Sequence, residues 1–587
     1  MLLICYFYSS MKASDYIARF LEAQGVTTIF EMSGGMITHM LDSLHQLTKI
    51  NIVSMHHEQS ASFAADAYAR ATGVPGVAMA TSGPGATNLL TGIASCYFDC
   101  APGVFITGQV NTFEQKGERP IRQLGFQETD IISMARPVCK ACFDVTDASE
   151  LPQMLEDAFR IAQEGRPGPV LIDIPMNVQR GDISVSDHDF KRVERDRIVH
   201  DVTPALLDEL AQALAAARKP LILVGRGVRA ALVAEEFRRF AHLVQVPVVA
   251  SLLAVDAMRY EDPLRVGYIG SYGNRWANMA LGHCDFILVL GARLDIRQTG
   301  ADTKYFQEGR AIWHVDCDPG EINNRVLGCR PVVADLADFF ELAHRYYRAA
   351  DFVARPEWMT ELNALRQQWA DTKEQPDVVG INPNEFMHSL SRGPAKVAAG
   401  YVADVGNHQQ WAAQSLELGS NQVFFTSGGL GSMGYALPAA LGLCFATDRR
   451  PVVVIAGDGG FQMNIQELQT IAHHRLPVKL VVINNNCLGM IRQFQDSYFE
   501  GRYQSTFWGY SAPDFTKIAE AYGISSRTVS EAVDVDDAAA WLWANPEEPA
   551  LLQVMVDSYT NCYPKLAFGR PITEMEPFAK PLEMEGT

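Results

Sequence analysis

The sequence predicts an α/β protein with three doubly wound domains, each built around a parallel sheet. Its 587 residues are more than one hydrophobic core normally supports, and predict about three or four domains. Short β-branched apolar runs, such as 452–456 and 478–483, have the composition of buried parallel strands. Many of these runs end in glycine-rich turns that precede segments with helical spacing of apolar residues.

Composition and charge exclude several classes of function. The chain is 48% hydrophobic and 20% charged, which is typical of a globular protein. Its net charge of −19 argues against nucleic acid or an anionic membrane as a partner. No apolar run reaches the roughly 20 residues of a membrane helix. The apolar residues 1–8 lack the basic start of a secretory signal, and we interpret residues 1–10 as an upstream extension before Met11.

The cysteine pattern predicts a reducing compartment. Eleven cysteines are scattered along the chain without disulfide-like spacing, so we expect a cytoplasmic protein. Cys139 and Cys142 have the spacing of a redox pair, but they lie in a strand-like stretch. Two thiols in the core are the preferred interpretation, and a redox pair is the alternative.

Residues 11–185 are predicted to form the first domain. Ser14 would cap an amphipathic helix over 14–23 that ends at Gly25. A second helix is expected over 61–70. The predicted strands are 28–32, 51–55, 76–80, 103–107 and 170–175.

Residues 186–350 are predicted to form the second domain, after a polar, linker-like stretch over 182–189. Three predicted strands, 220–224, 286–290 and 311–316, end in glycine, arginine or aspartate. This combination favours a dinucleotide site, in which the acidic strand end would bind ribose hydroxyls. The alternative is a spacer domain with this fold that binds nothing.

Residues 351–380 read as a charged helical connector, and 381–587 as the third domain with the most informative motif. Gly457-Asp458-Gly459-Gly460 follows one strand, a helix is expected from 464, and the next strand ends in three asparagines, 484–486. Both polar ends should share the carboxyl edge of a parallel sheet. A carboxylate, an amide oxygen and a helix amino end suit a magnesium ion that carries a diphosphate. The alternative is an ordinary βαβ unit with a glycine turn.

With Asp458 and Asn485 separated by 27 residues (485 − 458), the sequence resembles the thiamine-diphosphate enzymes, and within them the acetolactate synthase (acetohydroxyacid synthase) group. The resemblance covers nearly the whole chain from about Met11. It implies that the side chains of Asp458 and Asn485 bind magnesium, together with the backbone carbonyl of Cys487.

The resemblance also assigns catalytic roles. The segment from His57-Glu58-Gln59 through Ala64-Ala-Asp-Ala-Tyr-Ala-Arg-Ala-Thr-Gly73 matches that of the family's catalytic glutamate, which protonates the cofactor's aminopyrimidine ring. A partly buried carboxyl with a raised pKa suits this task. From the residues alone, Glu58 would be a helix-start carboxylate that complements the helix dipole. Gln127 matches a glutamine beside the site, and Met433 the bulky residue that bends the cofactor.

Further positions match the family's cofactor-binding residues, and the implied cofactors are thiamine diphosphate, Mg²⁺ and FAD. FAD would be structural, because the chemistry moves no net electrons. The positions implied for thiamine diphosphate are Gly35, Gly406, Asn407, His408, Gly431, Met433, Gly457, Gly459, Gly460 and Met490. Those implied for FAD are Arg166, Gly225, Arg226, Gly227, Gly291, Arg293, Asp295, Arg297, Asp316 and Asp335.

Several departures from the family pattern cluster where the second substrate would bind. Phe494 replaces a tryptophan, Met176 a lysine, Ile296 an aspartate and Asn111 a proline, and the loop 111–123 is longer. The substrate-contact candidates are Phe126, Ile296 and Phe494. Because contacts to the acceptor set specificity, these changes indicate a different, bulkier acceptor.

The predicted function is therefore a thiamine-diphosphate-dependent carboligase that transfers a two-carbon unit from pyruvate to a ketone, in particular a nucleotide-linked keto-sugar of branched-sugar biosynthesis. The alternatives are acetolactate synthase, a simple 2-keto acid decarboxylase, and a homologue without catalysis. Decarboxylases of this kind usually carry a His-His pair, but His473-His474 lies in the helix after Asp458. The resemblance implies a homodimer or homotetramer, in which Glu58 and the diphosphate site come from different chains.

Overall fold

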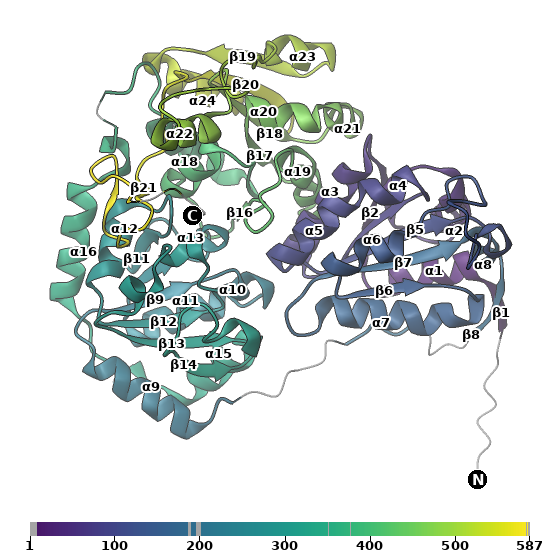
Figure 1. Cartoon of the computed structure of the whole chain (residues 1–587), viewed down its shortest axis with the longest axis horizontal. Helices are drawn as coiled ribbons and strands as arrows, with labels where there is room; N and C mark the ends of the chain where they lie inside the picture. The colour runs from purple at the N-terminus through teal and green to yellow at the C-terminus, as the bar shows by residue number, and fades with distance from the viewer. Residues whose placement is uncertain are drawn as a thin grey trace. The chain divides into compact units, whose positions relative to one another are not determined.

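The computed structural model describes residues 9–185, 190–194, 201–349, 352–375, 377–582 and 584. Within these residues, three six-stranded parallel sheets are accompanied by helices (Figure 1), which confirms the predicted fold class. The chain divides into two compact units. One contains Met1–Asp196, Gly429–Arg449 and Asn464–His474, and the other contains Arg197–Gly428, Arg450–Met463 and Arg475–Thr587. No helix in the described part of the chain is long and apolar enough to cross a membrane.

The first sheet lies in the first unit, and its strand order is β3-β2-β4-β5-β7-β6. Its strands are β2 (Thr28–Met32), β3 (Asn51–Ser54), β4 (Gly76–Ala80), β5 (Gly103–Gln109), β6 (Ala141–Asp144) and β7 (Pro169–Pro175). The helices of this region are α1 (Ala13–Ala23), α2 (Thr38–Leu47), α3 (Glu58–Thr72), α4 (Pro84–Asn88), α5 (Leu90–Asp99), α6 (Ile131–Ala135), α7 (Leu151–Gln163) and α8 (Met176–Gln179). The apolar faces of α1, α2 and α7 share one core with the sheet.

Three expectations for this region are wrong. Helix α1 begins at Ala13 without a side-chain cap, because the chain enters it directly from strand β1 (Ser9–Lys12). Ser14 is buried inside the helix, and its hydroxyl accepts a hydrogen bond from Ser43 (2.9 Å). Strand β1 pairs antiparallel with β8 (Asp182–Val185), so the first half of the predicted linker is a strand. Its remaining residues, 186–189, lie outside the described residues.

The third error concerns two cysteines. Cys139 and Cys142 are half-buried near the edge strand β6, and do not belong to the core. A hydrogen bond between the two thiols raises the pKa of Cys139 and lowers that of Cys142. Every cysteine in the described residues is a free thiol.

The middle sheet has the strand order β11-β10-β9-β12-β13-β14. Counted within the sheet, this is 3-2-1-4-5-6, the order of dinucleotide-binding folds, which reverses direction between β9 and β12. The strands are β9 (Pro220–Val224), β10 (Val248–Ala250), β11 (Arg265–Tyr268), β12 (Phe286–Leu290), β13 (Ala311–Asp316) and β14 (Arg330–Val333). The helices are α9 (Pro204–Ala216), α10 (Gly227–Ala230), α11 (Ala234–Val244), α12 (Arg275–His283), α13 (Ile296–Thr299), α14 (Thr303–Gln307) and α15 (Leu336–Tyr346).

The third sheet has the order β16-β15-β17-β18-β20-β19. Counted within each sheet, the first and third sheets share the order 2-1-3-4-6-5, which is consistent with an old duplication. The strands are β15 (Gly400–Ala403), β16 (Val423–Phe425), β17 (Val452–Gly457), β18 (Val478–Asn484), β19 (Ser525–Val529) and β20 (Ala550–Met555). The helices from 356 onward are α16 (Pro356–Gln368), α17 (Pro383–Ser391), α18 (Asn407–Ser415), α19 (Ala436–Ala446), α20 (Asp458–Met463), α21 (Leu468–His474), α22 (Gly489–Tyr498), α23 (Phe515–Ala521) and α24 (Val535–Leu542).

The C-terminal residues are not simply extended. Strands β21 (Lys565–Leu566) and β22 (Met575–Glu576) pair antiparallel. Buried Arg275 donates to the carbonyls of Met575 (3.3 Å) and Glu576 (2.9 Å), and its guanidinium pairs with Glu374 (2.8 Å). The end of the connector and helix α12 therefore hold this hairpin in place.

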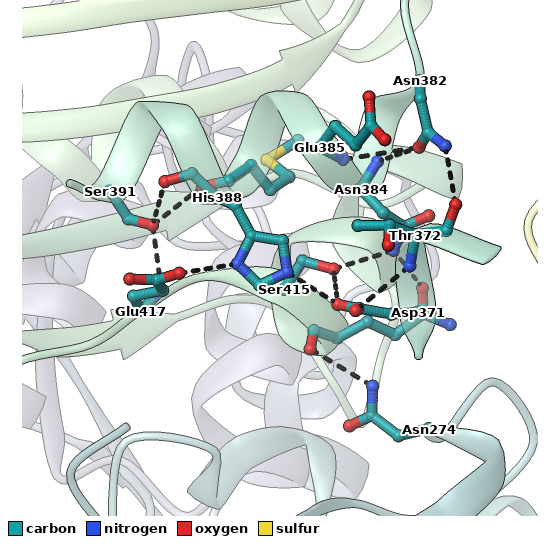
Figure 2. Close-up of polar contacts among 12 residues, drawn as sticks. Asn274, Asp371, Thr372, Asn382, Asn384, Glu385, His388, Ser391, Ser415 and Glu417 are labelled. Atoms are coloured by element: carbon teal, nitrogen blue, oxygen red, sulfur yellow. Dashed lines mark hydrogen bonds and ion pairs between the residues drawn. The ribbon is translucent and has the colours of Figure 1, made fainter. Parts of the chain in front are cut away.

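A second buried ionic cluster fixes the connector to helix α17. Figure 2 shows the His388 ring between two carboxylates: Nδ1 faces Glu417 Oε1 (2.9 Å) and Nε2 faces Asp371 Oδ2 (3.0 Å). Because both nitrogens face acceptors, the ring donates to both only as an imidazolium. Burial lowers the pKa of His388, but Asp371 and Glu417 outweigh it, and the net shift is upward.

Candidate active site

Polar residues follow three neighbouring strands of the third sheet. Asp404 and Asn407 come after β15, Asp458 directly follows β17, and Asn485 directly follows β18. Strands β17 and β18 pair in parallel, so their polar ends share the carboxyl edge, as the sequence predicts. In open α/β sheets this edge is where ligands bind.

Asp458 is buried, and no basic side chain of the described residues pairs with its carboxylate. It is 2% exposed, and its Oδ1 accepts a hydrogen bond from the Gly459 N–H (3.1 Å). Its Oδ2 has no hydrogen-bond partner among the described residues. Burial raises the pKa of this carboxyl to about 7, against the lowering effect of the Gly459 amide and the nearby Tyr510 hydroxyl. A buried carboxylate with an unused oxygen is suited to a divalent cation.

The glycines around Asp458 provide space and do not form a turn. The predicted turn over 457–460 is wrong, because helix α20 starts at Asp458, and none of its glycines has a positive φ. A Cβ on Gly460 would lie 2.6 Å from Asp404 Oδ1, and a Cβ on Gly457 would lie 2.9 Å from the His408 ring. The segment then continues through a 3₁₀ turn at Ile465–Glu467 into α21, where the sequence predicted one helix.

His408 fixes the end of strand β17. It is 5% exposed, and its Nε2 accepts a hydrogen bond from the Gly457 N–H (3.2 Å). A Cβ on Gly406 would lie 2.6 Å from the same ring, so the imidazole fits only between two glycines. Burial lowers the pKa of His408 to about 3. The ring is therefore neutral, with its proton on Nδ1, and positions the residue before Asp458.

The side-chain amides of Asn407 and Asn485 both lie close to Gly489. A Cβ on Gly489 would lie 2.6 Å from Asn485 Nδ2 and 3.0 Å from Asn407 Nδ2. Neither polar atom of the buried Asn407 side chain has a hydrogen-bond partner in the part of the chain that the structure describes. Asn485 Oδ1 accepts a hydrogen bond from the Cys487 N–H (3.3 Å). These unused polar atoms and the close-packed glycines fit a magnesium-diphosphate group.

The described residues contain no group of three His, Cys, Asp or Glu side chains arranged to hold a metal. A magnesium ion at this edge would therefore depend on few carboxylates, with Asp458 as the predicted ligand, and on amide and carbonyl oxygens and the ligand's phosphates, as Mg²⁺ commonly does. Cys487 is buried, and the contribution of its carbonyl stays a prediction. Met490 is half-buried against the core of the third sheet.

Sequence reasoning missed three residues at this edge. Asp404 is 1% exposed and packs against Gly460. The Ser558 hydroxyl donates to the Asn485 carbonyl (2.6 Å), and Tyr510 lies beside Asp458. Asp404 and Ser558 follow strands β15 and β20 closely, so a search for polar residues after each strand could have found them.

In the first unit, Glu58 is the first residue of α3. The His57 side chain caps this helix by accepting a hydrogen bond from the Gln59 N–H (3.0 Å). The half-buried Glu58 carboxylate accepts from Asn88 Nδ2 (2.9 Å). Its Oε1 lies 3.2 Å from the position of a Cβ on Gly85, so the glycine leaves room for the carboxylate over α4.

Gln127 packs against Gly83, directly before helix α4. Its backbone has a positive φ of 68°, and its Cβ lies 3.0 Å from the position of a Cβ on Gly83. Nothing lies within 4 Å of a Cβ on Gly35, whereas a Cβ on Gly34 would lie 2.5 Å from Thr81. The close contact between this backbone and Thr81 therefore requires a glycine at position 34, and not at position 35. The neighbouring Phe126 side chain is 80% exposed.

Met433 belongs to a loop of the first unit that precedes α19. The side chain is half-buried, and the flanking Gly431 and Gly434 have positive φ angles of 74° and 80°. The Gly434 carbonyl accepts a hydrogen bond from Asn464 Nδ2 (2.7 Å). The two glycines allow the backbone to turn where residues with a Cβ would be strained.

The glycines proposed for FAD pack two strand ends together at the point where the middle sheet reverses order. A Cβ on Gly225 would lie 2.2 Å from the Gly291 carbonyl, and the Gly227 N–H donates to that carbonyl (2.9 Å). Arg226 lies between them and precedes α10. These glycines have a packing role whether or not a nucleotide binds.

The charged FAD candidates after β9 share the same edge, because they end or follow the parallel strands β12, β13 and β14. Asp295 pairs with Arg293 (2.6 Å) and caps α13 through the Arg297 N–H (3.1 Å). Asp316 Oδ1 accepts from the Asp318 N–H (2.9 Å), and Asp335 caps α15. Arg166 belongs to the first unit, where its Nε donates to Cys100 Sγ (3.0 Å).

The acceptor candidates differ in exposure. Ile296 is 56% exposed, whereas Phe494 is half-buried and packs against Tyr498 (centroids 4.7 Å apart). The Lys565 ammonium lies 6.0 Å from the Phe494 ring centroid. Asn111 forms a capping box with Glu114, so this departure from the family pattern has a structural explanation in the longer loop.

Family models and curated relatives both match this chain. The C-terminal and N-terminal thiamine pyrophosphate (TPP) binding domains of the thiamine pyrophosphate enzymes match residues 404–554 and 11–134, and their central domain matches residues 207–342. The acetolactate synthase large subunit of Cyanidium caldarium is 34% identical over 571 residues, 95% of both chains. The isozyme 2 large subunit of Escherichia coli (strain K12) is 36% identical over 570 residues, 96% of this chain and 99% of the relative.

The chain belongs to the thiamine-diphosphate enzyme family. A probable acetolactate synthase large subunit of Methanocaldococcus jannaschii is also 35% identical over 562 residues, 93% of this chain and 92% of the relative. The protein is thus an acetolactate synthase-like, thiamine-diphosphate-dependent carbon–carbon ligase. Relatives of this similarity span all three sheets, so the likeness is not confined to the motif around Asp458.

Proposed function

We propose that this enzyme decarboxylates pyruvate and joins the two-carbon unit to a ketone, and that a second pyruvate is the best-supported acceptor, which gives acetolactate. The observation that carries the proposal is the edge with the unpartnered Asp458 and Asn407 atoms, in a chain whose relatives are named acetolactate synthases. Bound thiamine diphosphate supplies the electron sink for decarboxylation.

In this proposal each unit has its own task. Asp458 and Asn485, with the Cys487 carbonyl, hold magnesium, and the amino end of α20 favours the diphosphate. Glu58 exchanges a proton with the aminopyrimidine ring, beside Gln127, and Met433 supports the bent cofactor. The half-buried environment of Glu58 is compatible with a role as a proton donor.

A bulkier ketone, such as a nucleotide-linked keto-sugar, is the second candidate acceptor. It is supported by the residues that depart from the family pattern, Met176, Ile296 and Phe494, together with the exposed Phe126. The test is to incubate the pure enzyme with labelled pyruvate, alone and with a panel of ketones and keto-sugar nucleotides. Acetolactate from pyruvate alone supports the first candidate, preferential ligation to a keto-sugar the second, and acetaldehyde alone refutes both.

We also propose that FAD binds the middle sheet as a structural cofactor. The strand order 3-2-1-4-5-6 and the glycines at its reversal point support this, because dinucleotides bind at such points. The purified protein should be yellow and release flavin on denaturation. A colourless protein that takes up no flavin on reconstitution would make this sheet a spacer.

The assembly and location complete the proposal. We expect a cytoplasmic homodimer or homotetramer in which Glu58 and Asp458 of different chains complete one site. The free thiols of the described residues support a reducing compartment. Mass measurement of the native protein tests the assembly, and a monomer that is active at any dilution would contradict it.

A further inference from the structure

A fully buried ionic cluster in the first unit has no part in the chemistry described above. It consists of Asp66 and Arg70 of α3 and Asp99 of α5, hereafter the Arg70 cluster. Arg70 Nε donates to Asp66 Oδ1 (2.9 Å), and its Nη2 donates to Asp99 Oδ2 (3.0 Å). Both carboxylates are 0% exposed, and the Arg70 side chain is 1% exposed.

Two carboxylates and one guanidinium leave this cluster with a formal charge of −1. Burial lowers the pKa of Arg70, but Asp66, Tyr435 and Asp99 raise it well above its usual value, so the guanidinium stays charged. Replacing such buried ionic groups by apolar ones often leaves a protein equally or more stable. A gain in stability is therefore a weak explanation for this cluster. Its contacts indicate instead that it holds a neighbouring segment in one conformation.

Both carboxylates of the cluster also bind the loop that carries Met433. The Gly429 N–H donates to Asp99 Oδ1 (2.6 Å), and the Tyr435 hydroxyl donates to Asp66 Oδ2 (2.8 Å). A Cβ on Gly429 would lie 2.8 Å from the Phe98 Cβ, so only glycine brings its amide this close. The two ends of residues 429–435 are thus tied to one buried cluster.

A third contact ties the same loop to the start of α3. Asn464 Nδ2 donates to the Gly434 carbonyl (2.7 Å) and to Gln59 Oε1 (3.2 Å). Its Oδ1 accepts from the Ser60 hydroxyl (3.1 Å). Gln59 and Ser60 directly follow Glu58, so Asn464 joins the segments that carry Met433 and Glu58.

We propose that the Arg70 cluster and Asn464 are positioning residues: they fix the loop 429–435 with Met433, and the start of α3 with Glu58, so that each is in place for the cofactor site to which it contributes. The inference rests on the proposed roles of Met433 and Glu58. These residues act on the cofactor only through the loop and the start of α3. Loosening them should misalign the reacting groups, while the grip on the diphosphate by Asp458 is retained.

Tyr435→Phe tests this with little change of shape, since only the hydroxyl that reaches Asp66 is removed. Tyr68→Phe is the matched control. Tyr68 lies on α3, like Asp66 and Arg70, and is 2% exposed. Its hydroxyl contacts Thr27 (2.7 Å), so the control variant also loses one buried hydroxyl contact, but one that does not involve the loop. Both variants should unfold at similar temperatures.

Two readouts separate positioning from general destabilisation. In cofactor-free protein, amide hydrogen exchange of residues 429–435 should be several-fold faster in Tyr435→Phe and unchanged in Tyr68→Phe. At saturating thiamine diphosphate and magnesium, exchange of the thiazolium ring proton should slow by on the order of tenfold or more in Tyr435→Phe alone. Cofactor affinity should stay at the wild-type value.

The outcomes are distinct. If Tyr435→Phe matches Tyr68→Phe in both readouts, the inference is overturned. If wild-type protein itself fails to accelerate thiazolium proton exchange, the proposed function fails, and loop exchange alone still decides whether the cluster holds the loop. Should Tyr435→Phe not fold, Asn464→Ala, which removes the hydrogen bond to the Gly434 carbonyl, must show the same two changes.

Discussion

The buried His388 cluster yields a prediction about stability and pH. His388→Gln removes the positive charge between Asp371 and Glu417, whose side chains are only 11% and 12% exposed. Breaking a buried pair typically costs about 3–5 kcal/mol. Glu417 keeps Arg392 (2.7 Å), and Asp371 keeps the Ser415 hydroxyl, so both carboxylates stay partly compensated. We therefore expect a loss of about 2–3 kcal/mol in the free energy of unfolding.

The pH dependence follows from the directions of the shifts. The pKa of His388 is raised in the folded protein. Its contribution to the free energy of unfolding is therefore complete below the pKa of the unfolded state, about 6.5, and is lost as pH rises through the pKa of the folded state. The pKa values of Asp371 and Glu417 are lowered despite burial, that of Asp371 mainly by the bond to His388 and that of Glu417 mainly by the bonds to Arg392 and His388. Their contribution is present above about pH 4 and is lost as pH falls. Among the described residues, the Tyr260 ring also faces His388, with the two ring centroids 6.1 Å apart.

Urea unfolding, followed by tryptophan fluorescence at pH 5.5, 7 and 9, measures the effect. The difference between wild type and His388→Gln should be largest near pH 5–6.5 and shrink toward pH 9. His242→Gln is the control, because His242 forms a similar pair with Asp262 (2.9 Å) but is 45% exposed, and should cost about 0–1 kcal/mol. A difference for His388→Gln that is independent of pH, or no larger than that of His242→Gln, would refute the reasoning.

Three further predictions concern the proposed site. Glu58→Gln should keep the fold and cofactor binding, but slow thiazolium proton exchange by on the order of a hundredfold or more, and exchange at the wild-type rate in NMR would show that the assignment is wrong. Asp458→Ala should abolish retention of thiamine diphosphate, because the proposed magnesium ligand set loses its only carboxylate, and unchanged affinity in calorimetry contradicts this. Mixing inactive Glu58→Gln and Asp458→Ala chains should restore part of the activity, since one site of a mixed dimer has both intact halves; no recovery, with mixed dimers detected by mass spectrometry, would mean that each site is built from one chain.

The arrangement of strands and polar ends was predictable because it depends on local patterns. The β-branched run before Asp458 and the asparagines after the next run both fix positions at the carboxyl edge, once the strands are parallel. The helix predicted over 61–70 is present as α3 (Glu58–Thr72), which begins three residues earlier, at Glu58 itself, and ends two residues later.

The errors occur where distant contacts decide the local conformation. Gly457 and Gly460 look like a turn in sequence, but they are small because His408 and Asp404 pack against them. Serine is a common helix-capping residue, but strand β1, which pairs with β8, runs directly into the helix. The helix therefore starts at Ala13, one residue before Ser14. The contacts of the Arg70 cluster join segments more than 300 residues apart, such as Asp66 and Tyr435, and no local pattern reports them.

The central claim is that this chain forms a carbon–carbon bond from pyruvate with the help of thiamine diphosphate. The most direct measurement is mass spectrometry of the products from uniformly ¹³C-labelled pyruvate, with thiamine diphosphate and magnesium, for wild type and Asp458→Ala. For wild type only, we predict labelled carbon dioxide and a product in which two labelled carbons are joined to an acceptor ketone. Carbon dioxide release without any ligated product, or equal ligation by Asp458→Ala, would contradict it.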